Sequence, residues 1–383
     1  MLLDAIAGLA GGSRVLAHVI VPADGPVREA ALASGAAVTI VALPPSVAAM
    51  GDYGRSSPAA ILRLGVRLIV MLPSLLAYAR RLRAAITAVR PDIVHSNGLK
   101  MHLLTTLVAL RGTPVVWHLH DYVGRRAVLA RLIRTARWRC AVAIANSADV
   151  AADARALFGD SPRIEVLHNP VDLSRFTPEG PSIDLDAVAG LPPAPDGCIR
   201  VGLIATFALW KGHRVFLQAM ARVARRHSVR AYVIGGPIYT TESSQESLAA
   251  LRQVAVDEGI GESTGFTGFL ADTAAAMRSL DIVVHASIRP EPFGLVIAEA
   301  MAMGLPVITS ASGGAAEIVL AGETALVHVP GDADSLAGAI EALCESPELR
   351  REIGRRAHAD ALARFNRQPF ADALAAIYRR VAA

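Results

Sequence analysis

Within residues 285–317, two glutamates lie on either side of a glycine turn, at a spacing that could support the binding of a phosphate and of neighbouring hydroxyl groups. Glu291 and Glu299 are separated by seven residues, and Gly294 lies between them. The block follows an apolar run typical of a strand and leads into a helical pattern, so the N–H groups at the helix start can bind a phosphate. Gly294 lets a ligand approach the backbone closely. We expect Glu299 to accept hydrogen bonds from vicinal hydroxyls such as those of a ribose, and Glu291 to lie beside the group that is attached to the phosphate. The alternative is that both glutamates cap helices or are solvated.

Lys211 is one of only two lysines in a chain that otherwise uses arginine. It follows a predicted strand, where an ammonium can neutralise a diphosphate and stabilise it as a leaving group. Two glycine turns, with Gly236 and Phe269, end the next two predicted strands and are expected to shape a nucleotide pocket. The alternative is an exposed lysine and ordinary turns.

Histidines mark the end of a predicted strand in the first half of the chain. His118 and His120 share one face because strand side chains alternate. A metal site would need a third ligand that the sequence does not locate, so His118 is expected in the core. His120, beside Asp121, is the better candidate for contacting a substrate. Lys100 and His102 follow another predicted strand and are expected to line an acceptor groove.

Short apolar runs alternate with helical patterns along the whole chain, which is typical of a parallel sheet covered by helices. Residues 170–198 contain six prolines and interrupt this alternation, as expected of a connection between domains. We therefore predict an α/β fold with two Rossmann-like, doubly wound parallel-sheet domains facing a cleft, with ligands beyond the carboxyl ends of the strands. The expected strands are residues 15–21, 36–43, 92–96, 114–120 and 141–146, then 199–206, 229–236, 263–269, 281–287, 305–310 and 325–329.

Composition excludes several classes of protein. Of the 383 residues, 53% are hydrophobic and 19% charged, which excludes a disordered chain and a nucleic-acid-binding tail. Three cysteines without a C-x-x-C pair favour neither a disulfide framework nor a zinc ribbon, so a reducing, cytoplasmic location is expected.

Charge is unevenly distributed along the chain. Residues 1–172 carry 19 basic against 11 acidic residues, a balance of +8, and the remainder carries 19 against 23, a balance of −4. A basic half suggests an anionic acceptor or an acidic membrane surface.

The most lipophilic run, residues 68–79, contains Pro73 and is too short to span a bilayer. Arg80, Arg81 and Arg83 follow it, so the alternatives are a helix packed on the sheet and a peripheral contact with the inner face of a membrane.

The motifs E-P-F-G-L-x-x-x-E, W-K-G-H and H-D together resemble those of the retaining glycosyltransferases of family 4, which have the GT-B fold. The resemblance extends over nearly the whole chain. It implies transfer of a hexose from a UDP- or GDP-sugar to a hydroxyl of a carbohydrate or lipid-linked acceptor, with retention at the anomeric carbon. It also implies no metal cofactor, because a lysine and helix N-termini neutralise the diphosphate.

The same resemblance assigns roles to individual residues. Glu291 would contact the donor sugar, Glu299 the ribose, Lys211 the diphosphate and His120 the transferred sugar near its reacting centre. The expected catalytic residues are His120, Lys211 and Glu291; the expected donor site is Thr206, Lys211, Gly236, Phe269, Glu291, Phe293, Gly294, Leu295 and Glu299; the expected acceptor site is Asn97, Lys100, His102 and Arg125.

Two departures from the family pattern keep other functions open. Thr206 stands where the family usually has arginine, and the chain opens on a helical pattern where the family has a strand and a glycine-rich loop. The alternatives are a catalytically silent nucleotide-sugar-binding module and a GT-B sugar-nucleotide epimerase. The expected domains are residues 1–170, lacking that first strand and joined by a C-terminal helix at 369–383, and residues 171–368.

Overall fold

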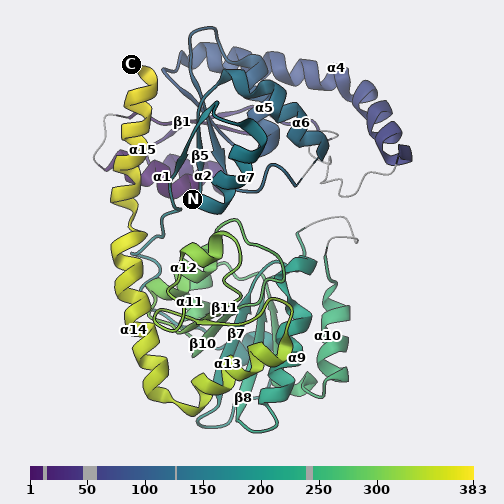
Figure 1. Ribbon diagram of the computed structural model, residues 1–383, viewed down its shortest axis with the longest axis vertical. Helices are drawn as coiled ribbons and strands as arrows, with labels where there is room; N and C mark the ends of the chain where they lie inside the picture. Colours follow the sequence, from purple (N-terminus) through teal and green to yellow (C-terminus); the bar gives the residue numbers. More distant parts are fainter. Residues whose placement is uncertain (12–14, 46–57, 126, 239–244) are drawn as a thin grey trace. The chain divides into compact units, whose positions relative to one another are not determined.

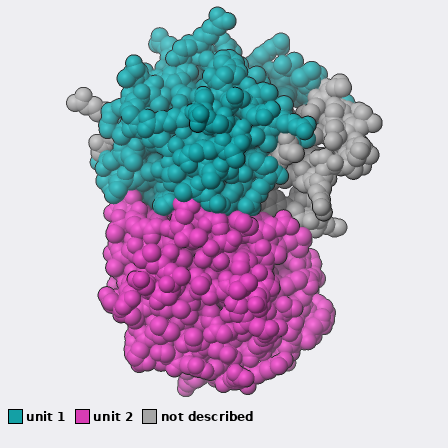
Figure 2. All heavy atoms as spheres, viewed as in Figure 1, with its two compact units in different colours: residues 1–170, 367–383 teal, residues 171–366 magenta. Residues whose placement is uncertain are grey.

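The computed structural model describes residues 1–11, 15–45, 58–125, 127–238 and 245–383. The chain forms two compact units (Figures 1 and 2). Unit 1 consists of residues 1–170 and 367–383, and unit 2 of residues 171–366.

Unit 1 is built on parallel strands. Its larger sheet has the order β3-β4-β5-β6, and β1 and β2 pair in a separate parallel sheet. The strands are β1 (His18–Val21), β2 (Ala37–Ile40), β3 (Val94–Asn97), β4 (Val115–Leu119), β5 (Cys140–Ala145) and β6 (Arg163–Val166). The helices are α1 (Leu2–Ala10), α2 (Pro26–Ala33), α4 (Pro58–Val89), α5 (Leu99–Val108), α6 (Ala127–Ala136), the 3₁₀ turn η1 (Arg137–Arg139), α7 (Ala148–Phe158) and α15 (Arg367–Ala382).

Alternation along β4 divides the interior of unit 1 into two cores. Trp117 and Leu119 pack in a core with buried residues of α4, α5, α6 and α7. Val116 points to the other face, where it packs with Phe370 and Leu374 of α15 and with residues of α1. The larger sheet of unit 1 is therefore covered by helices on both faces.

Unit 2 contains one six-stranded parallel sheet of order β12-β11-β10-β7-β8-β9. The strands are β7 (Ile199–Ile204), β8 (Val229–Ile234), β9 (Thr264–Gly268), β10 (Ile282–His285), β11 (Val307–Thr309) and β12 (Leu326–Val327). The helical elements are α8 (Leu185–Ala189), η2 (Leu209–Lys211), α9 (His213–Val223), α10 (Leu248–Asp257), η4 (Gly261–Ser263), α11 (Thr273–Met277), α12 (Leu295–Ala302), η5 (Gly314–Glu317), α13 (Ala333–Glu345) and α14 (Pro347–Arg364).

The sheet of unit 2 also separates two cores. One core contains Met277 of α11, Met301 of α12 and Ala357 of α14. The other contains residues of α9, α10 and α13, with Phe216 and Leu336 among its fully buried members. Parallel strands with helices on both faces confirm the predicted doubly wound α/β class.

The structure differs from the sequence prediction in one additional strand and in the ends of several others. The strand β6 (Arg163–Val166) was not predicted, because its four residues alternate polar and apolar without the long apolar run of the other strands. The strand expected at residues 15–21 begins only at His18.

The lipophilic run at 68–79 lies within α4, and no helix in the described part of the chain is both long and apolar enough to cross a membrane.

Candidate functional site

Three loops at the carboxyl edge of the unit 2 sheet are joined by backbone hydrogen bonds. The loop after β10 donates from the Ile288 N–H to the Trp210 carbonyl in the loop after β7, at 2.8 Å. Glu291 in the same loop donates its N–H to the Ser312 carbonyl at 3.0 Å and accepts from the Gly314 N–H at 2.7 Å. Glu291 therefore lies where the loops after β7, β10 and β11 meet.

The approach of two of these loops requires glycine at position 212. Gly212 has a φ of +73°, and a Cβ added there would lie 2.0 Å from the carbonyl oxygen of Ala286. Any side chain would therefore collide with the backbone that follows β10. This contact fixes Lys211, the preceding residue, beside the loop that carries Glu291.

The carboxylate of Glu291 is buried and receives three polar groups on one oxygen. The Lys211 Nζ lies 2.8 Å from Oε2, the His285 Nε2 3.1 Å and the Ser287 Oγ 3.1 Å. The His285 ring is held from its other side by Thr309, whose Oγ1 lies 3.1 Å from Nδ1. Two of the predicted catalytic residues, Lys211 and Glu291, thus form a direct ion pair.

Electrostatics keep Glu291 ionised within this cluster. Burial raises the pKa of a carboxyl, but the hydrogen bond from His285 and the charge of Lys211 outweigh burial and lower the pKa of Glu291 to about 2. The Lys211 ammonium also lies 4.0 Å from the centre of the Trp210 ring. The Lys211 ammonium and the Glu291 carboxylate therefore form an ion pair beside the Trp210 ring.

The helix α12 starts directly beside this pair. Gly294 is its N-cap with a φ of +95°, a conformation that L side chains rarely adopt. Leu295 is the first residue of α12, so its N–H belongs to the helix start that favours anions. Glu299 lies one turn further along and is half-buried.

Three other residues of the expected donor site lie on the same edge. Thr206 is half-buried in the loop after β7, and the next residue, Phe207, donates its N–H to the Gly236 carbonyl at 3.0 Å. Phe269 is 59% exposed, and its ring covers Gly236, where an added Cβ would lie 2.9 Å from the ring. The loops after β7, β8 and β9 therefore bring these residues together.

Phe293 corrects the sequence prediction. Its side chain is 2% exposed and packs edge to face against Phe365 in the unit 2 core, with ring centroids 6.0 Å apart. A core aromatic ring does not contact a ligand, so the expected donor contact is wrong for the Phe293 side chain.

In unit 1, two of the predicted residues meet at the carboxyl ends of β3 and β4. The His120 Nε2 lies 2.8 Å from the Asn97 Oδ1, and the His118 ring lies 4.2 Å from the His120 ring. Burial lowers the pKa of His120 to about 4, so the ring is neutral at physiological pH. Lys100 is exposed in the first turn of α5. Arg125 is also exposed, and its guanidinium stacks on Tyr122 at 3.5 Å.

His102 is a second correction, because it is fully buried and lines no open groove in this structure. Its Nδ1 lies 2.7 Å from the Ser96 Oγ, and its ring stacks on Trp117 with centroids 5.4 Å apart. Its position on the buried side of α5 determines this role, and an isolated histidine in a sequence does not reveal it.

Sequence reasoning also missed the partners of Glu291. His285 and Ser287 lie at the end of a strand that was predicted, and a period of two places them on one face. Two polar side chains on one face of an apolar strand were the available signal. Tyr378 of α15 was missed as well; its hydroxyl lies 2.5 Å from the Nδ1 of His95 in unit 1.

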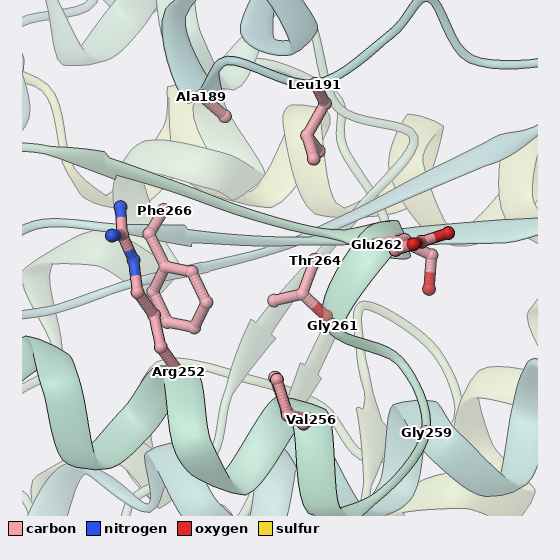
Figure 3. A pocket seen from close by; sticks show the side chains of 11 residues that line it. Ala189, Leu191, Arg252, Val256, Gly259, Gly261, Glu262, Thr264 and Phe266 are labelled. Atoms are coloured by element: carbon pink, nitrogen blue, oxygen red, sulfur yellow. The ribbon is translucent and has the colours of Figure 1, made fainter.

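A cavity of about 660 Å³ lies elsewhere in unit 2 (Figure 3). It is lined by α8, α10, η4 and the first residues of β9, and the Arg252 guanidinium approaches the Phe266 ring at 5.9 Å beside it. Because it adjoins the start of a parallel strand, it lies at the edge of the sheet opposite the Lys211–Glu291 pair.

Family models match both units of the chain. The model described as "Glycosyltransferase Family 4" matches residues 27–175, and the model described as "Glycosyl transferases group 1" matches residues 193–360. The chain belongs to the family 4 glycosyltransferases. The Glu291 cluster, Lys211 and the α12 start of this family 4 chain all lie within the group 1 match.

Two relatives of the chain are named as sugar transferases. A D-inositol 3-phosphate glycosyltransferase of Mycobacterium marinum is 34% identical over 224 residues, covering 58% of this chain and 46% of the relative. A lipopolysaccharide core biosynthesis mannosyltransferase, LpcC of Rhizobium leguminosarum, is 30% identical over 213 residues, covering 56% of this chain and 58% of the relative. The chain spans about half the length of the curated relatives it matches.

Solved structures show the same fold. Anabaena Alr3699/HepE in complex with UDP and glucose superposes with a TM-score of 0.79 at 23% identity, covering 98% of this chain and 94% of that one. A sucrose-phosphate synthase from Thermosynechococcus elongatus gives 0.72 at 20% identity, with coverage of 98% and 97%. Likeness at this identity establishes the fold of the family 4 chain as GT-B.

Proposed function

We propose that the chain transfers a hexose from a nucleoside diphosphate sugar to a hydroxyl acceptor with retention at the anomeric carbon. The observation that carries the proposal is the Lys211–Glu291 ion pair, which lies beside the start of α12 where the loops after β7, β10 and β11 meet. A cation and helix N–H groups suit a diphosphate, and a buried carboxylate suits sugar hydroxyls. The named complexes of Alr3699/HepE contain UDP and UDP-glucose, which favours a donor of this class.

In the proposed reaction, the bond between the anomeric carbon and the diphosphate oxygen breaks and negative charge collects on the diphosphate. Lys211 and the N–H groups at Gly294 and Leu295 stabilise that charge, and no metal cofactor is required. The acceptor oxygen bonds to the anomeric carbon from the face that the leaving group vacates. The acceptor proton passes to the departing phosphate oxygen, which leaves the product uncharged at its new glycosidic bond.

Unit 1 would contribute the remaining contacts. His120 is neutral and oriented by Asn97, which suits it to hydrogen-bond the transferred sugar. Lys100 and Arg125 are exposed cations that suit an anionic or lipid-linked acceptor at the inner face of a membrane.

The experiment is a donor panel with the purified chain. Thermal shift with UDP, GDP and their hexoses identifies the base, since a ligand stabilises the fold in proportion to occupancy. Nucleoside diphosphate release is then measured with phosphorylated lipids and sugars as acceptors. Release that depends on acceptor and is lost in Lys211→Met supports transfer. Isomerisation of the donor without acceptor would indicate the epimerase, and binding without release would indicate the silent module.

A further inference from the structure

A surface of unit 1 outside the proposed reaction site combines exposed apolar and basic side chains. Leu107, at the end of α5, and Trp138, in η1, are each 75% exposed, which is unusual for residues this large and apolar. Val128, Leu132, Arg131 and Arg134 are exposed on α6. We refer to these six residues as the α6 surface.

Three members of the α6 surface lie on one face of this helix. Val128, Leu132 and Arg131 recur at three and four residues, as positions on one helix face do, while Ile133 and Ala130 are buried on the opposite face. The helix therefore packs normally on its inner side and presents leucine, valine and arginine outward.

Hydrogen bonds hold the end of α5 beside η1 and α4. The Arg139 guanidinium in η1 donates to the carbonyls of Ala109 and Leu110, at 3.1 and 3.0 Å. Arg83 of α4 donates to the Val108 carbonyl at 3.1 Å. Leu107 therefore lies where α4, α5 and η1 converge, and Figure 1 shows α4, α5 and α6 gathered on one side of unit 1.

The charged residues of α4, α5, α6 and η1 all have one sign. Between residues 58 and 139 the sequence has 14 basic residues and two acidic ones, Asp92 and Asp121. Neither acid lies in α4, α5, α6 or η1. A second copy presenting the same surface would face like charge, which disfavours a symmetric dimer. Exposed leucine and tryptophan beside arginine suit a bilayer with anionic headgroups, where the side chains enter the interface and the guanidinium groups meet phosphates.

We propose that the α6 surface docks unit 1 on an anionic lipid bilayer. This contact goes beyond the proposed transfer reaction, since it uses none of the expected donor or acceptor residues. It is also distinct from the lipophilic run at 68–79, because its apolar contribution comes from α5, α6 and η1.

The test is co-sedimentation of the full chain with vesicles of phosphatidylcholine alone and of phosphatidylcholine with phosphatidylglycerol. We expect binding to the anionic vesicles that weakens as salt is raised. The double variant Arg131→Gln/Leu132→Ala should bind at least about tenfold more weakly, of which the arginine alone accounts for about fivefold. The matched control is Arg28→Gln/Leu32→Ala on α2, which removes one half-buried arginine that pairs with Asp24 and one exposed leucine elsewhere in unit 1, and should leave binding unchanged.

A second measurement reports insertion directly. Trp138 fluorescence should shift to the blue with anionic vesicles and be quenched by brominated lipid, and Trp138→Phe should remove the shift. Absence of vesicle binding, or equal weakening in the α2 control, would overturn the proposal. So would a concentration-dependent dimer that the α6 double variant abolishes. Donor binding measured in parallel separates this outcome from failure of the proposed reaction, since the α6 variants should bind UDP as the unmodified chain does.

Discussion

Replacing Lys211 by methionine keeps most of the side-chain volume and removes the charge that faces Glu291. The two side chains are only 17% and 10% exposed, and their charged atoms are 2.8 Å apart. At an effective dielectric constant of about 20, the Coulomb attraction at that distance is about 6 kcal/mol, and desolvation of the two groups offsets most of it. His285 and Ser287 still contact the carboxylate in the variant, so we expect unit 2 to lose about 2 kcal/mol of unfolding free energy.

The pH dependence of this loss identifies its cause. The pKa of Glu291 is about 2 in the folded chain, against 4.5 for a glutamate without these neighbours, so its ionisation stabilises the fold above pH 4.5 and that contribution is lost as pH falls toward 2. Without the charge of Lys211, the pKa of Glu291 in the folded chain rises toward 4.5, and the ionisation of Glu291 contributes less to the stability of the fold. The deficit of Lys211→Met should therefore be largest at neutral pH and should narrow below pH 4.5.

The assay is calorimetric and urea unfolding of four proteins: the unmodified chain, Lys211→Met, Glu291→Gln and the double variant. We expect a coupling energy of about 1–3 kcal/mol between the two positions. Titration with UDP on the same proteins should show a loss of about 2–4 kcal/mol in binding for Lys211→Met. A coupling energy near zero, or a stability deficit that does not change with pH, would refute the reasoning from the ion pair.

Three further predictions concern other parts of the two units. Glu299→Ala should weaken UDP and intact donor alike, whereas Glu291→Gln should reduce turnover more than UDP binding; equal loss of UDP affinity in both would contradict the assignment. Burial lowers the pKa of His118 well below 6.5, so the unfolded chain takes up the proton first and stability should fall as pH drops below 6.5. In urea titrations at several pH values, His118→Asn should flatten that slope, and an unchanged slope would contradict the reasoning from burial. Gly212→Ala should cost about 3 kcal/mol or more, since both its φ and its space exclude a Cβ; near-wild-type melting would show that the two loops separate at little cost.

Apolar runs predicted most of the fold because buried parallel strands are apolar on both faces. The strand β4 is the clear case, with all five residues buried and helices on either side. The strand β6 escaped prediction because an edge strand with Arg163 and Glu165 has no such run. A strand can thus be predicted from the sequence where both of its faces are buried. The prediction is ambiguous for a strand at a solvent-exposed edge of the sheet.

The candidate site was predictable to the level of residue type and strand end. Lys211 and Glu291 were each expected in a loop that follows a strand, and the structure places their side chains in contact. What the sequence did not show is the direction of each side chain: Phe293 and His102 turn into cores, and His285 turns toward Glu291. These directions depend on which face of a helix or strand is covered, and that is fixed by elements distant in sequence.

Because α15 belongs to unit 1, this unit is completed only after the whole of unit 2 has been synthesised. Residues 171–366 form unit 2 without interruption, so on a ribosome unit 2 can fold as soon as its own residues have emerged. Unit 1 must wait for Phe370 and Leu374, which cover Val116 and its neighbours on β4 and β5. Until then an apolar face of its sheet lies open to solvent and to other nascent chains. The unit whose synthesis begins first is therefore the last to be completed. A chaperone that binds exposed apolar surface would act on unit 1.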